Sequence, residues 1–299
     1  MIESLDKVKR VLARNRVDLA FIVGNGINRY AYGAAKDVSW VDMLLDIWKE
    51  ISPVTLSTIS KGISLTEFYD IMEFEAGSDD VVSKVAEYIE NLHPAPYHTN
   101  LRDRLIEWNV PLLTTNFDRN LSVDLKLYKF GTAGVGFTDY YPWGVYFSNA
   151  ELKSPTNGFG VWHINGMVGY RRSIRLGLSA YTGLSSRVRE HLHKGDGSEY
   201  LDLKDEKNWK GFGTWLNIIF NRNLCIFGLG LDENETFSRW LLIERARYFR
   251  KFPEHKKSGW YVCRKGELSE GKRFFLNYVG IEIVSLDSYD EIYKGMFDL

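Results

Sequence analysis

Four short segments of the chain gather the glycines, amides, carboxylates and the histidine that could act on a nucleotide-like ligand. They are GNGIN (24–28), TTNFD (114–118), HING (163–166) and GLGLD (228–232). Glycine turns ahead of a helix let backbone N–H groups reach a phosphate, and hydroxyls, amides and carboxylates hydrogen-bond sugar hydroxyls. A histidine with an ordinary pKa near about 6.5 can transfer a proton at neutral pH. The segments therefore suit binding of a phosphorylated sugar and proton transfer on it.

The first segment follows the apolar run 18–23, which predicts a strand, and precedes INRYAYGAA, which can start a helix. Gly24, Asn25, Gly26 and Asn28 are thus candidate ligand-binding residues at a strand–turn–helix junction. The segment lacks the third glycine of the dinucleotide-binding fingerprint at its usual spacing. A tight turn that needs glycine for its backbone conformation explains the same residues, so both interpretations stay open.

The second segment comes directly after the apolar run 110–113, which predicts a buried strand. Thr115, Asn116 and Asp118 place a hydroxyl, an amide and a carboxylate at the end of that strand, a combination that suits ribose recognition. Alternatively, Thr115 or Asn116 caps the helix that we expect over about 119–125.

The fourth segment follows a predicted strand over 223–227. Gly228, Gly230 and Asp232 leave room for a nucleotide at the end of that strand. The alternative is structural: Asp232 caps a helix that starts at Glu233, and Glu235, three residues further on, completes a capping box.

His163 and Asn165 lie two residues apart at the end of a predicted strand over 160–164. Side chains two apart on a strand share one face, so both could contact one ligand. A lone histidine in a core strand can equally be a hydrogen-bonded structural residue.

The elements that position these segments alternate between short apolar runs and longer helical patterns. Further strands are predicted over 260–263 and 281–285, with helices over 209–220, 233–249 and 267–278. This alternation predicts an α/β fold, a Rossmann-like, mostly parallel sheet with helices on both faces. The pattern over residues 39–108 predicts an inserted helical module. Residues 126–160 are rich in Gly, Pro and aromatic residues, which predicts an irregular loop. Ligands bind such sheets where the carboxyl ends of strands meet helices, and three of the segments, GNGIN, TTNFD and GLGLD, fall there.

Composition narrows the classes of function. The 299 residues carry 38 basic and 39 acidic side chains, a net charge of −1, so no whole-protein field attracts nucleic acid. We expect Arg245, Arg247 and Arg250 to lie on a solvated face rather than to bind nucleic acid.

Two cysteines, Cys225 and Cys263, cannot build a four-cysteine zinc site, and we expect no metal. The charged first 18 residues contain neither a secretory signal nor a membrane span, so we expect a cytoplasmic, reduced protein without a membrane partner.

Taken together, four stretches of sequence resemble the sirtuin-like NAD-hydrolysing domains of bacterial anti-phage defence systems. The stretches are FIVGNGIN, PLLTTNFD, VWHINGMV and IFGLGLDENETFSRWLL, and the similarity spans about residues 17–265. The resemblance implies one sirtuin-like NAD-binding domain over 1–299, with the helical insertion at about 39–108 and the loop at about 126–160. It also implies that Asn116 positions the ribose or the attacking water and that His163 is the acid or base. Many relatives have a histidine directly before the strand-end glycine, where this chain has Asn165.

The activity implied is that of an NAD⁺ glycohydrolase that releases nicotinamide and ADP-ribose, with NAD as substrate, and depletes NAD in an abortive-infection response. The four-cysteine zinc module of deacetylase sirtuins cannot form here, which favours NAD cleavage over deacylation. We expect control by a homo-oligomer, by a second defence-system protein that senses the trigger, or by both. Two alternatives stay open: a non-catalytic regulatory subunit that binds NAD or ADP-ribose, and an ADP-ribosyltransferase.

Overall fold

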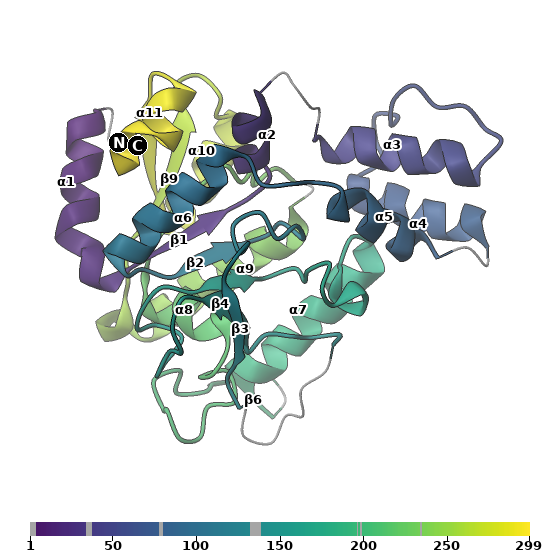
Figure 1. The fold of residues 1–299 in the computed structure, drawn as a ribbon. Helices are drawn as coiled ribbons and strands as arrows, with labels where there is room; N and C mark the ends of the chain where they lie inside the picture. Colours follow the sequence, from purple (N-terminus) through teal and green to yellow (C-terminus); the bar gives the residue numbers. More distant parts are fainter. Residues whose placement is uncertain are drawn as a thin grey trace.

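An eight-stranded sheet forms the centre of the fold in the computed structural model, which describes residues 4–33, 38–77, 80–131, 139–195, 197, 199–233 and 235–299 (Figure 1). Its strands are β1 (Leu19–Val23), β2 (Leu112–Thr114), β3 (Lys126–Lys129), β4 (Val145–Ser148), β5 (Val161–His163), β8 (Asn223–Phe227), β9 (Gly259–Arg264) and β10 (Glu282–Leu286). They lie in the order β10-β9-β8-β1-β2-β5-β4-β3. The run from β10 to β5 is parallel, and β4 and β3 are antiparallel at one edge. The predicted α/β, Rossmann-like, mostly parallel fold is confirmed.

The central strand β1 is buried on both faces, as its unbroken apolar run requires. Ala20 and Ile22 belong to one hydrophobic core, and Leu19, Phe21 and Val23 belong to a second core on the opposite face. The helices α7 (Leu178–Leu192), α8 (Trp215–Asn221), α9 (Thr236–Lys251) and α10 (Glu270–Tyr278) pack into the first core. The helices α1 (Leu5–Asn15), α2 (Gly26–Tyr32), α6 (Pro96–Trp108) and α11 (Tyr289–Tyr293) pack into the second. Side chains that alternate along β1 therefore pack against two layers of helices, one on each face of the sheet.

Three helices form a module beside the sheet: α3 (Trp40–Ile51), α4 (Leu65–Ala76) and α5 (Val81–Glu90) (Figure 1). Their apolar faces share a third core, which also includes Phe117 from the segment after β2 and Ile174 from the segment after β5. Ser64 and Glu67 form a capping box that fixes the start of α4. The module therefore touches the segments that follow the strands. It is shorter than the predicted 39–108, because α6 covers the sheet instead.

Two local predictions were wrong. Residues 126–160 are not an irregular loop throughout, because β3 and β4 pair there in an antiparallel ladder; residues 132–138 lie outside the described part of the chain. The aromatic side chains that suggested a loop stack on one another, with Tyr128 and Tyr146 rings 5.6 Å apart. No helix forms over residues 119–125, because residues 120–124 are in turns and Asp124 has a φ of 61°, in the left-handed region that a helix does not adopt.

A small antiparallel pair, β6 (His193–Lys194) with β7 (Glu199–Tyr200), follows α7. The polar segment after it stays in turns up to Thr214, so the helix predicted from residue 209 begins later, at Trp215. Thr214 is the reason, because its side chain accepts a hydrogen bond from the Leu216 N–H and caps α8 there.

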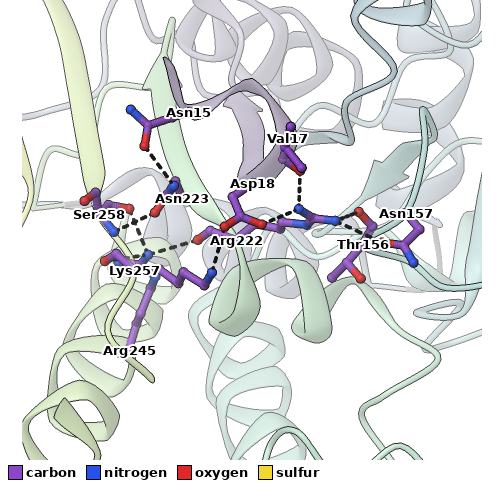
Figure 2. Close-up of polar contacts among 10 residues, drawn as sticks. All are labelled: Asn15, Val17, Asp18, Thr156, Asn157, Arg222, Asn223, Arg245, Lys257 and Ser258. Carbon is purple, nitrogen blue, oxygen red and sulfur yellow. Dashed lines mark hydrogen bonds and ion pairs between the residues drawn. The ribbon is translucent and has the colours of Figure 1, made fainter. Parts of the chain in front are cut away.

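Arginines hold the amino ends of the parallel strands together, at the edge opposite the glycine turns (Figure 2). Arg222, directly before β8, forms an ion pair with Asp18, directly before β1, at 2.9 Å. Asp18 also pairs with Lys257 at 3.1 Å. Arg222 donates further hydrogen bonds to the carbonyls of Val17 and Thr156 and to Asn157 Oδ1. This cluster joins segments that lead into β1, β5, β8 and β9.

Arg245 completes the cluster from α9, and its predicted solvated position was wrong. The side chain is only 2% exposed, and its guanidinium donates to backbone carbonyls at 2.9–3.2 Å (Figure 2). The acceptors are the carbonyls of Ile219, Arg222, Lys257 and Ser258. Burial lowers the pKa of Arg245 to about 9, which still leaves it charged at neutral pH.

Candidate functional site

Two glycine turns pack against each other at the carboxyl edge of the sheet. The Gly26 N–H donates to the Gly228 carbonyl at 2.8 Å, and the Ile27 N–H donates to the Gly24 carbonyl at 3.2 Å. A Cβ on Gly26 would lie 2.7 Å from Gly228 Cα, closer than real side chains come. Gly228 itself has a φ of 62°. The turns thus need glycine for packing, and the N–H groups of Gly26 and Ile27 bond within the protein instead of pointing at a phosphate.

Asn25, Asn28 and Asp118, predicted from separate motifs, meet in one buried polar network. Asn28 Nδ2 donates to Asp118 Oδ2 at 2.8 Å and to Asn25 Oδ1 at 3.1 Å. His98, on α6, donates from Nε2 to Asn28 Oδ1 at 2.9 Å, because its Nδ1 already accepts a hydrogen bond from the Ala95 N–H. Burial raises the pKa of Asp118, and the Asn28 hydrogen bond opposes that rise. Burial lowers the pKa of His98 to about 4.

Asn116 and His163, the predicted catalytic residues, are in direct contact. His163 Nδ1 lies 2.9 Å from the Asn116 carbonyl oxygen, which can only accept, so Nδ1 carries the proton and Nε2 holds a free lone pair. Asn116 Nδ2 donates to the Gly24 carbonyl at 3.3 Å, which ties this pair to the first glycine turn. Burial lowers the pKa of His163 to about 4, far below the ordinary value that the sequence suggested. The imidazole is therefore neutral at pH 7.

Three buried polar atoms at this edge have no hydrogen-bond partner among the described residues: Asn116 Oδ1, His163 Nε2 and Asn165 Oδ1. Their side chains are 3–5% exposed. An unsatisfied buried polar group costs about 1–3 kcal/mol, so proteins place few of them without a reason. All three atoms are hydrogen-bond acceptors in the form present. They can therefore receive hydrogen bonds from hydroxyl or amide groups of a bound molecule.

Three cavities lie at the same edge of the sheet, and Asn165 lines one of them. The cleft, whose volume of about 1420 Å³ includes open solvent, is lined by Asn25, Gly26, Thr115, Gly228, Gly230 and Asp232. The chamber, of about 590 Å³ with open solvent included, is lined by Thr115, Phe117, Asn165, Tyr181 and Glu235. The pocket, of about 310 Å³ on the same measure, is lined by Asn25, Asn28, Phe117 and Asp118. Trp40, the first residue of α3, lines all three and packs edge-on against Phe117, with ring centroids 5.3 Å apart.

Sequence reasoning missed Trp40, Arg29 and His98, and their positions explain why. Arg29 follows Asn28 on α2 and lines the cleft, with no hydrogen-bond or ion-pair partner for its side chain in the described part of the chain. In the sequence, only its position directly after the first motif could have indicated that Arg29 belongs to the site. Trp40 and His98 come from helices whose docking on the sheet edge depends on tertiary packing.

The helix after the second glycine turn starts later than predicted, and the proposed capping box at Asp232 was wrong. α9 begins at Thr236 with Glu235 in the N-cap position. Leu231, buried with a φ of 50°, turns the chain away from a helix, and the Glu235 N–H bonds to the Asp232 carbonyl at 2.9 Å. Asp232 lines the cleft and forms an ion pair with Lys272 on α10. The helix cap expected of Thr115 or Asn116 was also wrong, because turns follow both.

No protein-family model and no curated protein matches the chain. Within the described ranges, no three His, Cys, Asp or Glu side chains are grouped so that they could hold a metal ion. No helix in the same ranges combines the length and apolar character needed to cross a bilayer.

Proposed function

We propose that this protein is a sirtuin-like NAD⁺ glycohydrolase, which cleaves NAD⁺ to nicotinamide and ADP-ribose. The observation that carries the proposal is the group of unpartnered acceptors Asn116 Oδ1, His163 Nε2 and Asn165 Oδ1 at the edge of the sheet where the cleft and the chamber lie, with Asn165 on the wall of the chamber and Thr115, next to Asn116, on the walls of both. Ribose hydroxyls, a carboxamide and water all offer donors to such atoms. The cleft lies at the carboxyl edge of a parallel sheet, where α/β folds bind nucleotides.

NAD⁺ would lie along the cleft, with its adenosine end near Gly228, Gly230 and Asp232 and its pyrophosphate beside the first glycine turn. Because the Gly26 and Ile27 N–H groups bond within the protein, Arg29 is the group that would pair with the pyrophosphate. Thr115 lines the same cleft. It would meet the nicotinamide ribose beside Asn116, with the network of Asn28 and Asp118 supporting this end.

Breaking the glycosidic bond expels neutral nicotinamide and develops an oxocarbenium-like ribose, so the site must orient the sugar and water and accept one proton. The free lone pair on His163 Nε2 would accept a hydrogen bond from a ribose hydroxyl or from the water. Asn116 Oδ1 would orient the same groups, and its backbone carbonyl fixes the His163 tautomer. These roles require a neutral imidazole, which burial supplies.

The test is to incubate purified protein with NAD⁺ and to quantify nicotinamide and ADP-ribose by chromatography. Asn116→Ala and His163→Ala should each lower the rate at least about 10²-fold, because each variant loses an acceptor that orients the ribose or the water. His93→Ala, which removes an exposed imidazole, is the matched control and should keep the wild-type rate. Stoichiometric release of both products supports hydrolysis. Undiminished turnover by either site variant removes that residue from the mechanism.

A second candidate is a non-catalytic subunit that binds NAD or ADP-ribose and regulates a partner. It is favoured by the low pKa of His163, about 4, which makes the imidazole a weak base. Tight binding of NAD⁺ by calorimetry, without nicotinamide release by the isolated protein or in phage-infected lysate, would decide for this candidate.

Uncontrolled NAD⁺ loss would kill a growing cell, so the enzyme needs restraint. We propose that assembly into a homo-oligomer or binding of a second defence-system protein controls the activity. Full activity in an unpartnered monomer, measured by light scattering alongside turnover, would contradict this control.

A further inference from the structure

Glu235 occupies an N-cap position without capping. It precedes α9, but its side chain accepts no hydrogen bond from the helix, and the described residues supply no hydrogen-bond or ion-pair partner to its carboxyl group. The residue lines both the chamber and the cleft. A capping residue would bond back to the free N–H groups of the first turn. The Glu235 carboxyl is instead available to whatever enters the chamber.

Two residues on the wall of the chamber are close in sequence to Asn116 and His163. Thr115, on its wall, directly precedes Asn116, and Asn165, also on its wall, lies two residues beyond His163. Asn165 is 5% exposed and its Oδ1 atom has no partner among the described residues. The rest of the wall is largely apolar, with side chains from α3, α4 and α7. A polar molecule in the chamber therefore meets few polar side chains, Asn165 and Glu235 among them.

Burial and the charges around Glu235 bring the pKa of its carboxyl close to neutral pH. Burial and the neighbouring Asp232 raise the pKa of Glu235 to about 7, and Lys272 on α10 opposes that rise. From α7, the Tyr181 hydroxyl faces the same carboxyl, and its own pKa is raised by burial and by Glu235. An acid–base group works best when its pKa is near the working pH. Glu235 meets that condition and His163, with a pKa of about 4, does not.

We propose that Glu235 is the general base of the hydrolysis, taking a proton from a water molecule that enters through the chamber and donates its other hydrogen to Asn165 Oδ1. This inference rests on the proposed NAD⁺ hydrolysis. The water oxygen bonds to the ribose C1′ as the bond from C1′ to the nicotinamide nitrogen breaks. The bonding electron pair leaves with neutral nicotinamide, and the water proton moves to the Glu235 carboxylate. His163 and Asn116 then position the ribose.

The decisive variant is Glu235→Gln, which keeps the shape and removes the basic carboxylate. We expect kcat to fall at least about 10²-fold with KM for NAD⁺ little changed. Wild-type kcat should rise with pH through about 7, where the carboxylate forms, and the variant should lose that rise. Glu233→Gln removes the same charge from an exposed residue of the same loop and should behave as wild type. Since the described residues give the Glu235 carboxyl no hydrogen bond and its raised pKa means that its charged form destabilises the fold, Glu235→Gln should melt at or above the temperature of wild type.

The possible failures are distinct. If wild type releases nicotinamide and Glu235→Gln keeps its rate and pH profile, the base role is refuted while the hydrolysis stands. If wild type releases none, either alone or in phage-infected lysate, the proposed function falls and the base role falls with it. A crystal structure of the ligand-free protein adds a test without turnover: an ordered water bonded to Asn165 Oδ1 in the chamber is expected, and a dry chamber would overturn the proposed water site.

Discussion

Replacing Gly26 by alanine tests whether the first glycine turn serves packing or ligand approach. A Cβ there would lie 2.7 Å from Gly228 Cα and 2.8 Å from the Gly228 carbonyl oxygen, both backbone atoms that cannot rotate away. The two turns would have to separate and lose the hydrogen bond between the Gly26 N–H and the Gly228 carbonyl. Overpacking costs about 1–3 kcal/mol and the hydrogen bond about 1 kcal/mol, so we expect a loss of about 2–4 kcal/mol.

The expected change in melting temperature follows from chain length. The entropy of unfolding is about 2.1 cal/mol/K per residue, which for 299 residues gives about 0.6 kcal/mol/K. The Gly26→Ala variant should therefore melt about 3–6 °C below wild type in differential scanning calorimetry. Gly169→Ala is the control, because a Cβ there meets nothing within 4 Å. An unchanged melting temperature with lost NAD⁺ binding would refute the packing explanation and show that the glycine serves the ligand.

Three further outcomes follow from the structure. Arg245→Met should lower the free energy of unfolding, measured in urea, by about 3 kcal/mol, because it leaves buried carbonyl groups without a hydrogen-bond donor. Arg250→Met, on the exposed face of the same helix, should change it little. Equal effects of the two variants would contradict the stabilising role of the arginine cluster. The folded pKa of His163, about 4, lies below its unfolded value of about 6.5, so its stabilising contribution is complete above pH 6.5 and is lost as the pH falls toward 4. Between pH 7.5 and pH 5 wild type should therefore lose about 2 kcal/mol more stability than His163→Gln, and a gain at pH 5 would reverse the argument. Arg29→Gln should raise KM for NAD⁺ about tenfold with kcat nearly constant and weaken the salt dependence of KM, and an unchanged KM would remove Arg29 from the pyrophosphate site.

The strands of the sheet were the most predictable part of the fold. β8 was predicted at its observed bounds, because four apolar residues follow Asn223 and end at a glycine. The antiparallel edge was missed because a segment rich in glycine and aromatic residues is typical of a loop. Its strand structure depends on the pairing of β3 with β4 and on the stacking of their aromatic rings. The start of α9 was missed because the positive φ of Leu231 depends on packing, since leucine by itself does not favour it.

The candidate site was predictable where polar residues follow a strand directly. Asn28 and Asp118 meet as expected from the parallel topology, since both come after neighbouring strands. Glu235 was recognised only as part of a cap, because nothing local shows that its carboxyl faces a chamber built by α3, α4 and α7. The lowered pKa of His163 could not be read from the sequence either. It is set by how deeply the folded chain buries the ring.

Trp40 gives the three cavities a shared wall, with a thermodynamic consequence. Molecules in compartments that share a side chain cannot bind independently when that side chain must adjust to either of them. The coupling is reciprocal: whatever one occupant does to the affinity of a second, the second does equally to the first. A dissociation constant measured for a ligand of the cleft therefore describes this protein only when the contents of the chamber and the pocket are also specified.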